Sequence, residues 1–203
     1  MSRYATQSST RRSYLRGLTL VELMITISIA GILLALAVPS LQTFVSRNAM
    51  RSLANDFTLG LQRTRAEAIN RNQCMVMCKS STANTSQPVC DTTLDNWAVG
   101  WAVYGLPSCD IADRPDSATE AAAQAEQLVF AKEGTDARYT LAVQGTAVRA
   151  IMFNARGVPG LAGARRFNLS DSQSTTAENN QYGRTLCVDK VGRVRSIAFG
   201  FSC

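Results

Sequence analysis

An uncharged apolar run near the N-terminus limits the possible folds of this chain more than any other feature. From Leu23 to Ser46, 24 residues carry no charged side chain. As a helix, a segment of this length can cross a hydrocarbon core of about 30 Å. Arginines stand at positions 3, 11, 12 and 16 before the run and are fewer just after it. The positive-inside rule therefore places residues 1–17 in the cytoplasm and the rest of the chain beyond the inner membrane.

Three interpretations of this segment are possible. A secretory signal uses the same basic start and apolar run, and residues 35–37 (Ala-Leu-Ala) offer a small-x-small cleavage site. A single-pass anchor needs no cleavage. Neither interpretation explains Glu22, a carboxylate just inside the apolar block, which costs on the order of 2.5–3.5 kcal/mol by insertion scales when it has no partner.

The third interpretation follows from residues 16–24 (Arg-Gly-Leu-Thr-Leu-Val-Glu-Leu-Met), which resemble the prepilin signature. In proteins that carry this signature, a prepilin peptidase cuts after the glycine and N-methylates the new first residue. The resemblance implies cleavage between Gly17 and Leu18, methylation of Leu18, and a role for Glu22 in filament assembly. The chain departs from the signature at Leu18, where phenylalanine is usual.

Cleavage before Leu18 would create an ammonium group four residues, or about one helical turn, from Glu22. The amine of a neighbouring subunit could equally be the partner, and either charge alone in a packed filament core would be costly. The pair would therefore fix the register between subunits. Gly31 and Pro39 stand where type IV pilins commonly carry these residues, and Pro39 predicts a kink or a locally melted turn rather than a break.

Beyond Pro39, apolar residues continue at helical spacing from Phe44 to Ala68, which predicts an amphipathic helix that ends near Asn72. The pattern then changes to short β-like runs that predict one or two antiparallel sheets. These runs are residues 74–78, 97–104, 128–132, 139–143, 147–153, 166–169, 185–188 and 194–199.

The segments between the runs are polar. Residues 117–127 predict a short helix or a mobile loop, and residues 80–87 and 170–181 predict loops with little to bury. Trp97 and Trp101 are four residues apart, so on a strand they would face the same side and fill the core beneath the helix.

Several phrases resemble the GspH/FimT/FimU family of minor pilins and H-type pseudopilins. They are residues 65–69 (Arg-Ala-Glu-Ala-Ile), 97–101 (Trp-Ala-Val-Gly-Trp), 153–157 (Phe-Asn-Ala-Arg-Gly) and 192–195 (Gly-Arg-Val-Arg). The resemblance implies an α+β type IV pilin fold, in which a long N-terminal helix packs on an antiparallel β-sheet domain. The chain would then divide into a leader (1–17), a transmembrane and filament-core helix (18–45), an amphipathic helix half (46–72) and a β-rich globular domain (73–203).

Six cysteines all lie beyond the apolar run, at positions 74, 78, 90, 109, 187 and 203. An even number after an export segment predicts disulfides in an oxidising compartment, which favours a periplasmic or extracellular domain. Six cysteines permit 15 pairings, and we predict Cys78 with Cys90, closing a polar loop, and Cys187 with Cys203, closing the C-terminal tail.

The positive charge is unevenly spread along the chain. The net charge is +6, but without residues 1–17 only 17 basic side chains remain against 15 acidic ones. Residues 138–203 hold nine basic groups against three acidic ones, so the last third is the only plausible polyanion-binding face. Arg193 and Arg195, with Lys190 nearby, resemble the Gly-Arg-x-Arg tail of DNA-binding FimT-type pilins. The resemblance implies weak contacts with DNA phosphates that do not depend on base sequence.

The absence of histidine from the sequence removes the usual general base and the commonest zinc ligand, so we expect no enzyme, cofactor or metal. The leading hypothesis is a minor pilin that helps to initiate a type IV pilus together with other major and minor pilins. The alternative is an H-type pseudopilin of the type II secretion system, and DNA uptake is compatible with the first.

Overall fold

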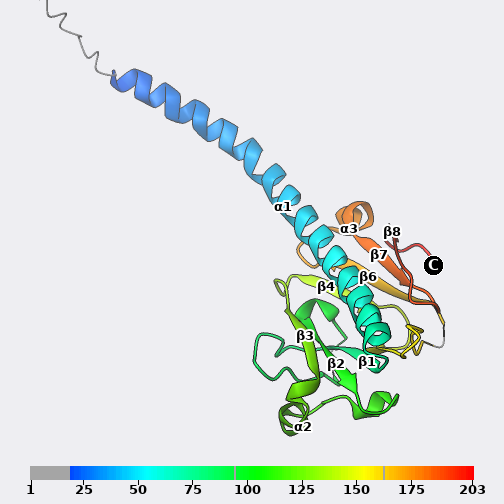
Figure 1. Cartoon of the computed structure of the whole chain (residues 1–203). Coiled ribbons are helices and arrows are strands. Elements are labelled where there is room, and N and C mark those ends of the chain that lie inside the picture. Colours follow the sequence, from blue (N-terminus) through cyan, green and yellow to red (C-terminus); the bar gives the residue numbers. More distant parts are fainter. Residues whose placement is uncertain (1–18, 94, 162) are drawn as a thin grey trace, which may run out of the picture. The chain divides into compact units, whose positions relative to one another are not determined.

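The computed structural model describes residues 19–93, 95–161 and 163–203 (Figure 1). The chain divides between Thr43 and Phe44 into two compact units. Helix α1 spans Leu20–Asn70 and contributes residues to both. Pro39 lies within this continuous helix, and the kink predicted there stays a prediction.

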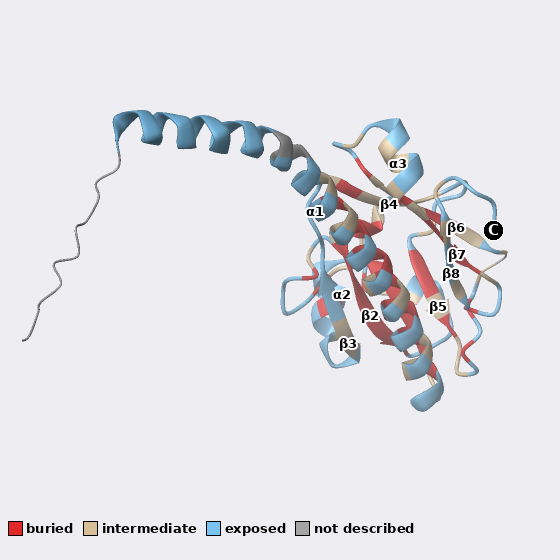
Figure 2. Cartoon of the chain, turned by 90° about the horizontal axis from the view of Figure 1, so that it is seen from above, coloured by how far each residue is buried: buried red, intermediate tan, exposed pale blue. Residues whose placement is uncertain are grey.

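In the first part of α1, from Leu20 to Leu41, the apolar side chains whose burial the structure describes are exposed (Figure 2). The helix begins after Thr19, whose hydroxyl accepts a hydrogen bond from the backbone N–H of Glu22 at 3.2 Å, an N-cap arrangement. By length and composition alone, α1 is able to cross a membrane. A helix that is apolar all round needs an apolar environment, which a lipid bilayer or neighbouring helices can supply.

The second unit contains two four-stranded antiparallel sheets. The first has the order β3-β2-β1-β5, formed by Leu128–Glu133, Gly100–Leu106, Cys74–Lys79 and Ala150–Phe153. The second has the order β4-β6-β7-β8, formed by Tyr139–Val143, Arg165–Asp171, Arg184–Val188 and Val194–Ala198. A strand therefore forms in each of the eight predicted runs.

The second half of α1 packs on both sheets and forms the main core. Its buried face, from Met50 to Ala68, contacts apolar residues of β1, β2, β4, β5, β6 and β7. Phe57 lies at the centre and meets Trp97 and Trp101 edge-on, with ring centroids 5.4 and 5.8 Å apart. Both tryptophans fill the core as predicted, but Trp97 belongs to a 3-10 turn, η1 (Trp97–Val99), and not to the strand.

A smaller apolar cluster lies on the opposite face of β1. Cys74, Val76 and Cys78 point into it, whereas Met75 and Met77 point into the main core. Both faces of β1 are therefore buried, which explains why its sequence is apolar without alternation.

Two polar segments contain helices, and the first of them was among the predicted alternatives. Residues 117–127 form α2 (Ala118–Ala123) and the 3-10 turn η3 (Ala125–Gln127). The loop predicted over 170–181 is wrong in its second half, where α3 spans Thr176–Tyr182. A capping box starts this helix: the Thr175 hydroxyl accepts from the Glu178 N–H, and the Glu178 carboxylate accepts from the Thr175 N–H. The remaining 3-10 turn, η2 (Ile111–Asp113), follows β2.

Candidate assembly and nucleic-acid surfaces

The predicted processing site, Gly17 and Leu18, lies outside the described residues. Glu22 stands in the first turn of α1, three residues after the capping Thr19. A carboxylate at this end of a helix is favoured by the partial positive charge of the unpaired N–H groups. The position also leaves the carboxylate available to a cation that approaches the helix start.

All six cysteines form disulfides. Cys78 is bonded to Cys90 and Cys187 to Cys203, which are the two pairs expected from the sequence. The third pair, Cys74 with Cys109, was not anticipated, because a separation of 35 residues gives no local signal. Two of the bonds tie β1 to the loops beyond the smaller cluster, and the third returns the C-terminus to β7.

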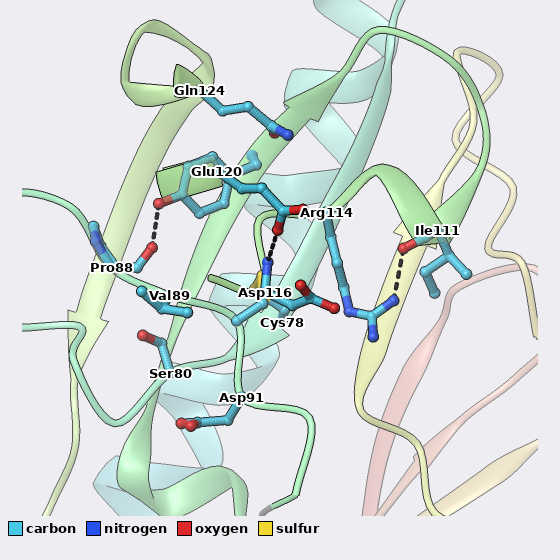
Figure 3. Close-up of a disulfide and its surroundings, with 12 residues drawn as sticks. Cys78, Ser80, Pro88, Val89, Asp91, Ile111, Arg114, Asp116, Glu120 and Gln124 are labelled. Atoms are coloured by element: carbon cyan, nitrogen blue, oxygen red, sulfur yellow. Dashed lines mark hydrogen bonds between the residues drawn. A yellow bond between two sulfur atoms is a disulfide. The ribbon is translucent and has the colours of Figure 1, made fainter. Parts of the chain in front are cut away.

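Figure 3 shows Cys78 and the loop residues around it. The hydroxyl of Tyr104 donates to the carbonyl of Pro88 at 2.5 Å. The backbone N–H of Cys90 donates to the Pro115 carbonyl at 2.8 Å. Burial raises the pKa of Tyr104 to about 12, so this phenol remains a donor over the physiological range. The disulfide and these bonds fix two irregular loops to the sheet.

A tight turn before β8 positions Arg193. The N–H of Gly192 donates to the Asp189 carbonyl at 3.0 Å, and Gly192 has a φ of 76°, a left-handed conformation that glycine adopts without strain. The Asp189 carboxylate accepts from the N–H groups of Val191 and Arg193 and from Nε of Arg193 at 3.1 Å. Asp189 therefore fixes the Arg193 side chain at the turn and partly compensates its charge.

The strand register determines which basic residues share a face with Arg195. Arg195 pairs with Cys187 on β7, and Cys187 pairs with Arg166 on β6. Residues paired across antiparallel strands point to the same side, so Arg166 and Arg195 flank the C-terminal disulfide on the face away from the core. We call Arg166, Arg193 and Arg195, together with the exposed Lys190 of the turn between β7 and β8, the C-terminal basic surface.

Two arginines of residues 138–203, the basic last third of the sequence, do not belong to this surface. Arg184 begins β7 and lies at the end of that strand opposite the Asp189 turn. Arg165 alternates with Arg166 and points to the other side of β6, where it lines a different pocket with Arg114 and Arg149. The surface is thus smaller than the charge count of the last third suggested.

A buried carboxylate that the sequence did not single out connects three elements. Asp171, at the end of β6, is fully buried and accepts from Ser46 of α1 at 2.5 Å and from Nε and Nη2 of Arg138 at 3.1 and 2.5 Å. Its backbone N–H and carbonyl bond the side chain of Asn179 on α3. Burial alone would raise the pKa of Asp171, but the hydrogen bonds from Arg138, Ser46 and Gln173 outweigh it and lower the pKa to about 2.

The acidic loop after β2 is organised by its own hydrogen bonds. Asp110 caps η2 by accepting from the Ala112 N–H, and Asp113 accepts from the Ser108 hydroxyl. Across the described ranges, no group of three or more histidine, cysteine or acidic side chains is placed to hold a metal ion.

These features define a pilin-like protein, with an exposed apolar helix that continues onto a disulfide-bonded antiparallel β domain. The crystal structure of the type IV minor pilin FimU of Pseudomonas aeruginosa strain PAO1 in space group P21 matches with a TM-score of 0.52 and 18% identity, over 75% of this chain and 90% of that chain. The P65 form matches with a TM-score of 0.49 and 16% identity, over 72% and 91%. The fold is therefore that of the type IV pilins.

The sequence profile for GspH, described as Type II transport protein GspH, matches residues 53–192. The chain belongs to this family, because the match covers more than half of its length. The prokaryotic N-terminal methylation motif matches residues 12–38. Among curated proteins, no relative matches. The predicted family resemblance and the predicted fold are confirmed.

Proposed function

We propose that this protein is a minor pilin that helps to assemble a type IV pilus. The observation that carries the proposal is the combination, in one chain, of a methylation motif, an exposed apolar helix and a compact disulfide-bonded domain. The helix would anchor the subunit in the inner membrane and later pack in the filament core. Three disulfides support a periplasmic position of the domain before assembly.

An H-type pseudopilin of the type II secretion system is the second candidate, and the description of the matching family favours it. The disulfide-closed C-terminus favours the pilus, because the resemblance associates such closure with pilus subunits. A clean deletion should therefore reduce twitching or transformation and leave protein secretion intact. Loss of secretion alone would assign the chain to the secretion machine.

Processing of the N-terminus gives a direct test of the prepilin interpretation. We expect the mature protein to begin at Leu18 with a methylated amine, since the methylation motif covers this position. Mass spectrometry of the N-terminal peptide from membrane or filament fractions measures both features. A mature protein that begins at Val38, after the Ala-Leu-Ala site, would instead identify a secretory signal.

We further propose that the C-terminal basic surface binds DNA. Arg193 and Arg195 are two residues apart and therefore point to the same side of the chain, and the strand register places Arg166 on that side as well. Arginines bind phosphate oxygens through paired N–H donors, and such contacts carry no base specificity. We therefore expect weak, sequence-independent binding that decreases as salt increases.

The test is a titration of the fragment 44–203 with duplex DNA at two salt concentrations. The double variant Arg193→Gln/Arg195→Gln should lose affinity on the order of tenfold, and its salt slope should be shallower by about 0.9 per lost phosphate contact. The variant Arg149→Gln/Arg156→Gln removes equal charge from exposed positions outside this surface and should bind like the wild type. Equal binding by all three proteins, or none at low salt, would contradict a role in DNA uptake.

A further inference from the structure

We propose that a pocket formed by Arg47, Arg51 and Arg184 binds the phosphate group of an anionic phospholipid at the membrane surface. The pocket has a volume of about 260 Å³ and is also lined by Gln181 and Tyr182. Its residues come from α1, from the end of α3 and from the start of β7. The inference rests on the proposed anchoring of α1 in the inner membrane.

The fold holds the three guanidinium groups near one another. Arg47 and Arg51 are four residues apart on α1 and therefore share one face of the helix. Arg184 follows Tyr182 by two residues, after the short connection between α3 and β7. The guanidinium carbon of Arg47 lies 3.4 Å from the Tyr182 ring centroid, a cation–π contact that orients this side chain.

The pocket has hydrogen-bond donors that are not used. Nε of Arg47 is buried and has no hydrogen-bond partner. In the described part of the chain, neither Arg47, Arg51 nor Arg184 forms an ion pair with a carboxylate. Three like charges that line one small pocket repel one another, and a buried donor without a partner is costly. A bound anion would relieve both conditions.

The carboxylates on neighbouring segments already have other partners. Glu178 interacts electrostatically with Arg47, but its Oε2 accepts from the backbone N–H and the hydroxyl of Thr175 at 2.8 and 2.9 Å. Asp171 forms an ion pair with Arg138 and accepts a hydrogen bond from the Ser46 hydroxyl of α1. The pocket thus retains a net positive charge.

The position of Arg47 in the sequence identifies the source of the anion. Arg47 is the first charged residue after the apolar run Leu23–Ser46, so a spanning α1 carries it out of the hydrocarbon at the level of the lipid headgroups. A guanidinium group can donate two parallel hydrogen bonds to a phosphate group, and tyrosine is enriched at the membrane interface, where the headgroups lie. A phosphodiester of an anionic lipid meets these requirements, whereas the choline group of a zwitterionic lipid would bring a further cation to the pocket.

The test uses the full mature chain in a nonionic detergent, with dioctanoyl phosphatidylglycerol, dioctanoyl phosphatidylcholine or inorganic phosphate as the probe. Native mass spectrometry gives the fraction of protein that retains each probe as its concentration increases. We expect phosphatidylglycerol to be retained at least tenfold more tightly than the other two. The variant Arg51→Gln/Arg184→Gln should lose tenfold or more of this affinity.

Two further variants make the result specific. Arg149→Gln/Arg156→Gln removes the same charge from exposed positions outside the pocket and should retain phosphatidylglycerol like the wild type. Arg51→Lys/Arg184→Lys keeps the charge but loses the paired donors, so its affinity should be intermediate.

Equal retention of both lipids by the wild type, or of phosphatidylglycerol by the wild type and the glutamine variant, would overturn the inference. Retention of inorganic phosphate as strong as that of phosphatidylglycerol would assign the pocket to free phosphate and would overturn it too. Fractionation of cell membranes tests the anchoring separately. A chain that fractionates with the inner membrane but shows no lipid preference refutes only the pocket, whereas a chain absent from that membrane refutes the anchoring.

Discussion

Replacing Asp171 by alanine is expected to lower the free energy of unfolding of the fragment 44–203 by about 3 kcal/mol at pH 7. The variant would leave the guanidinium of Arg138 without its buried carboxylate and the hydroxyl of Ser46 without its acceptor. The cost of breaking a buried ion pair exceeds the value of the pair itself, because the remaining charge loses its compensation. Urea denaturation followed by tryptophan fluorescence measures the change.

The pH dependence of stability gives an independent readout of the same carboxylate. Its pKa is about 2 in the folded chain, below the ordinary value of 3.8. The unfolded state therefore takes up the proton first, and the stabilisation is fully present above about pH 4 and is lost as the pH decreases towards 2. The wild type should lose stability over this interval more steeply than Asp171→Ala.

Asp56→Ala is the matched control, since Asp56 pairs with Lys132 at 3.4 Å on the surface. Both of these side chains are partly exposed, and an ion pair of this kind contributes about 1 kcal/mol or less. A loss at Asp171 no larger than that of Asp56→Ala would show that the buried network does not hold α1, β6 and α3 together.

Most of the fold was predictable because its signals are local. The apolar spacing on α1 predicts a helix with one buried face, and Phe57 and Leu61 lie on that face. The β-like runs became strands because each combines branched or aromatic residues with flanking turn residues. Trp97 fails this rule, since Gly100, with a φ of 112°, ends the 3-10 turn η1 and turns the chain at the first residue of β2.

The interactions that organise the surfaces were not predictable, because they depend on register and on distant partners. Asp171 bonds Arg138 and Ser46, which are 33 and 125 residues away in the sequence. Arg184 was grouped by composition with Arg195, whereas the pairing of β7 with β8 separates them. Helix α3 did have a local signal in its capping box, but it buries no residue and therefore shows no apolar period.

Replacing Glu22 by alanine is expected to leave the protein inserted in the membrane and cleaved, but to reduce its incorporation into filaments by at least tenfold. Glu22 stands in the first turn of α1, near the amine that cleavage before Leu18 would create on the same or a neighbouring subunit. Without the carboxylate, this ammonium group would be buried alone in the filament core, and an unpaired buried charge costs several kcal/mol. The expected defect therefore lies in assembly and not in membrane insertion, which the removal of a charge favours.

Comparison of sheared filaments with membrane fractions by quantitative immunoblotting separates these two steps. Glu22→Gln retains the hydrogen-bonding shape without the charge, so it should fail as strongly as alanine if the ion pair is what matters. Ser28→Ala is the control in the same apolar segment, because the Ser28 hydroxyl bonds only the Met24 carbonyl within the helix at 2.7 Å and should be dispensable. If Glu22→Ala and Ser28→Ala enter filaments equally well, the carboxylate does not set the register between subunits. The apolar surface of α1 would then be sufficient for assembly, and Glu22 would serve only the start of the helix.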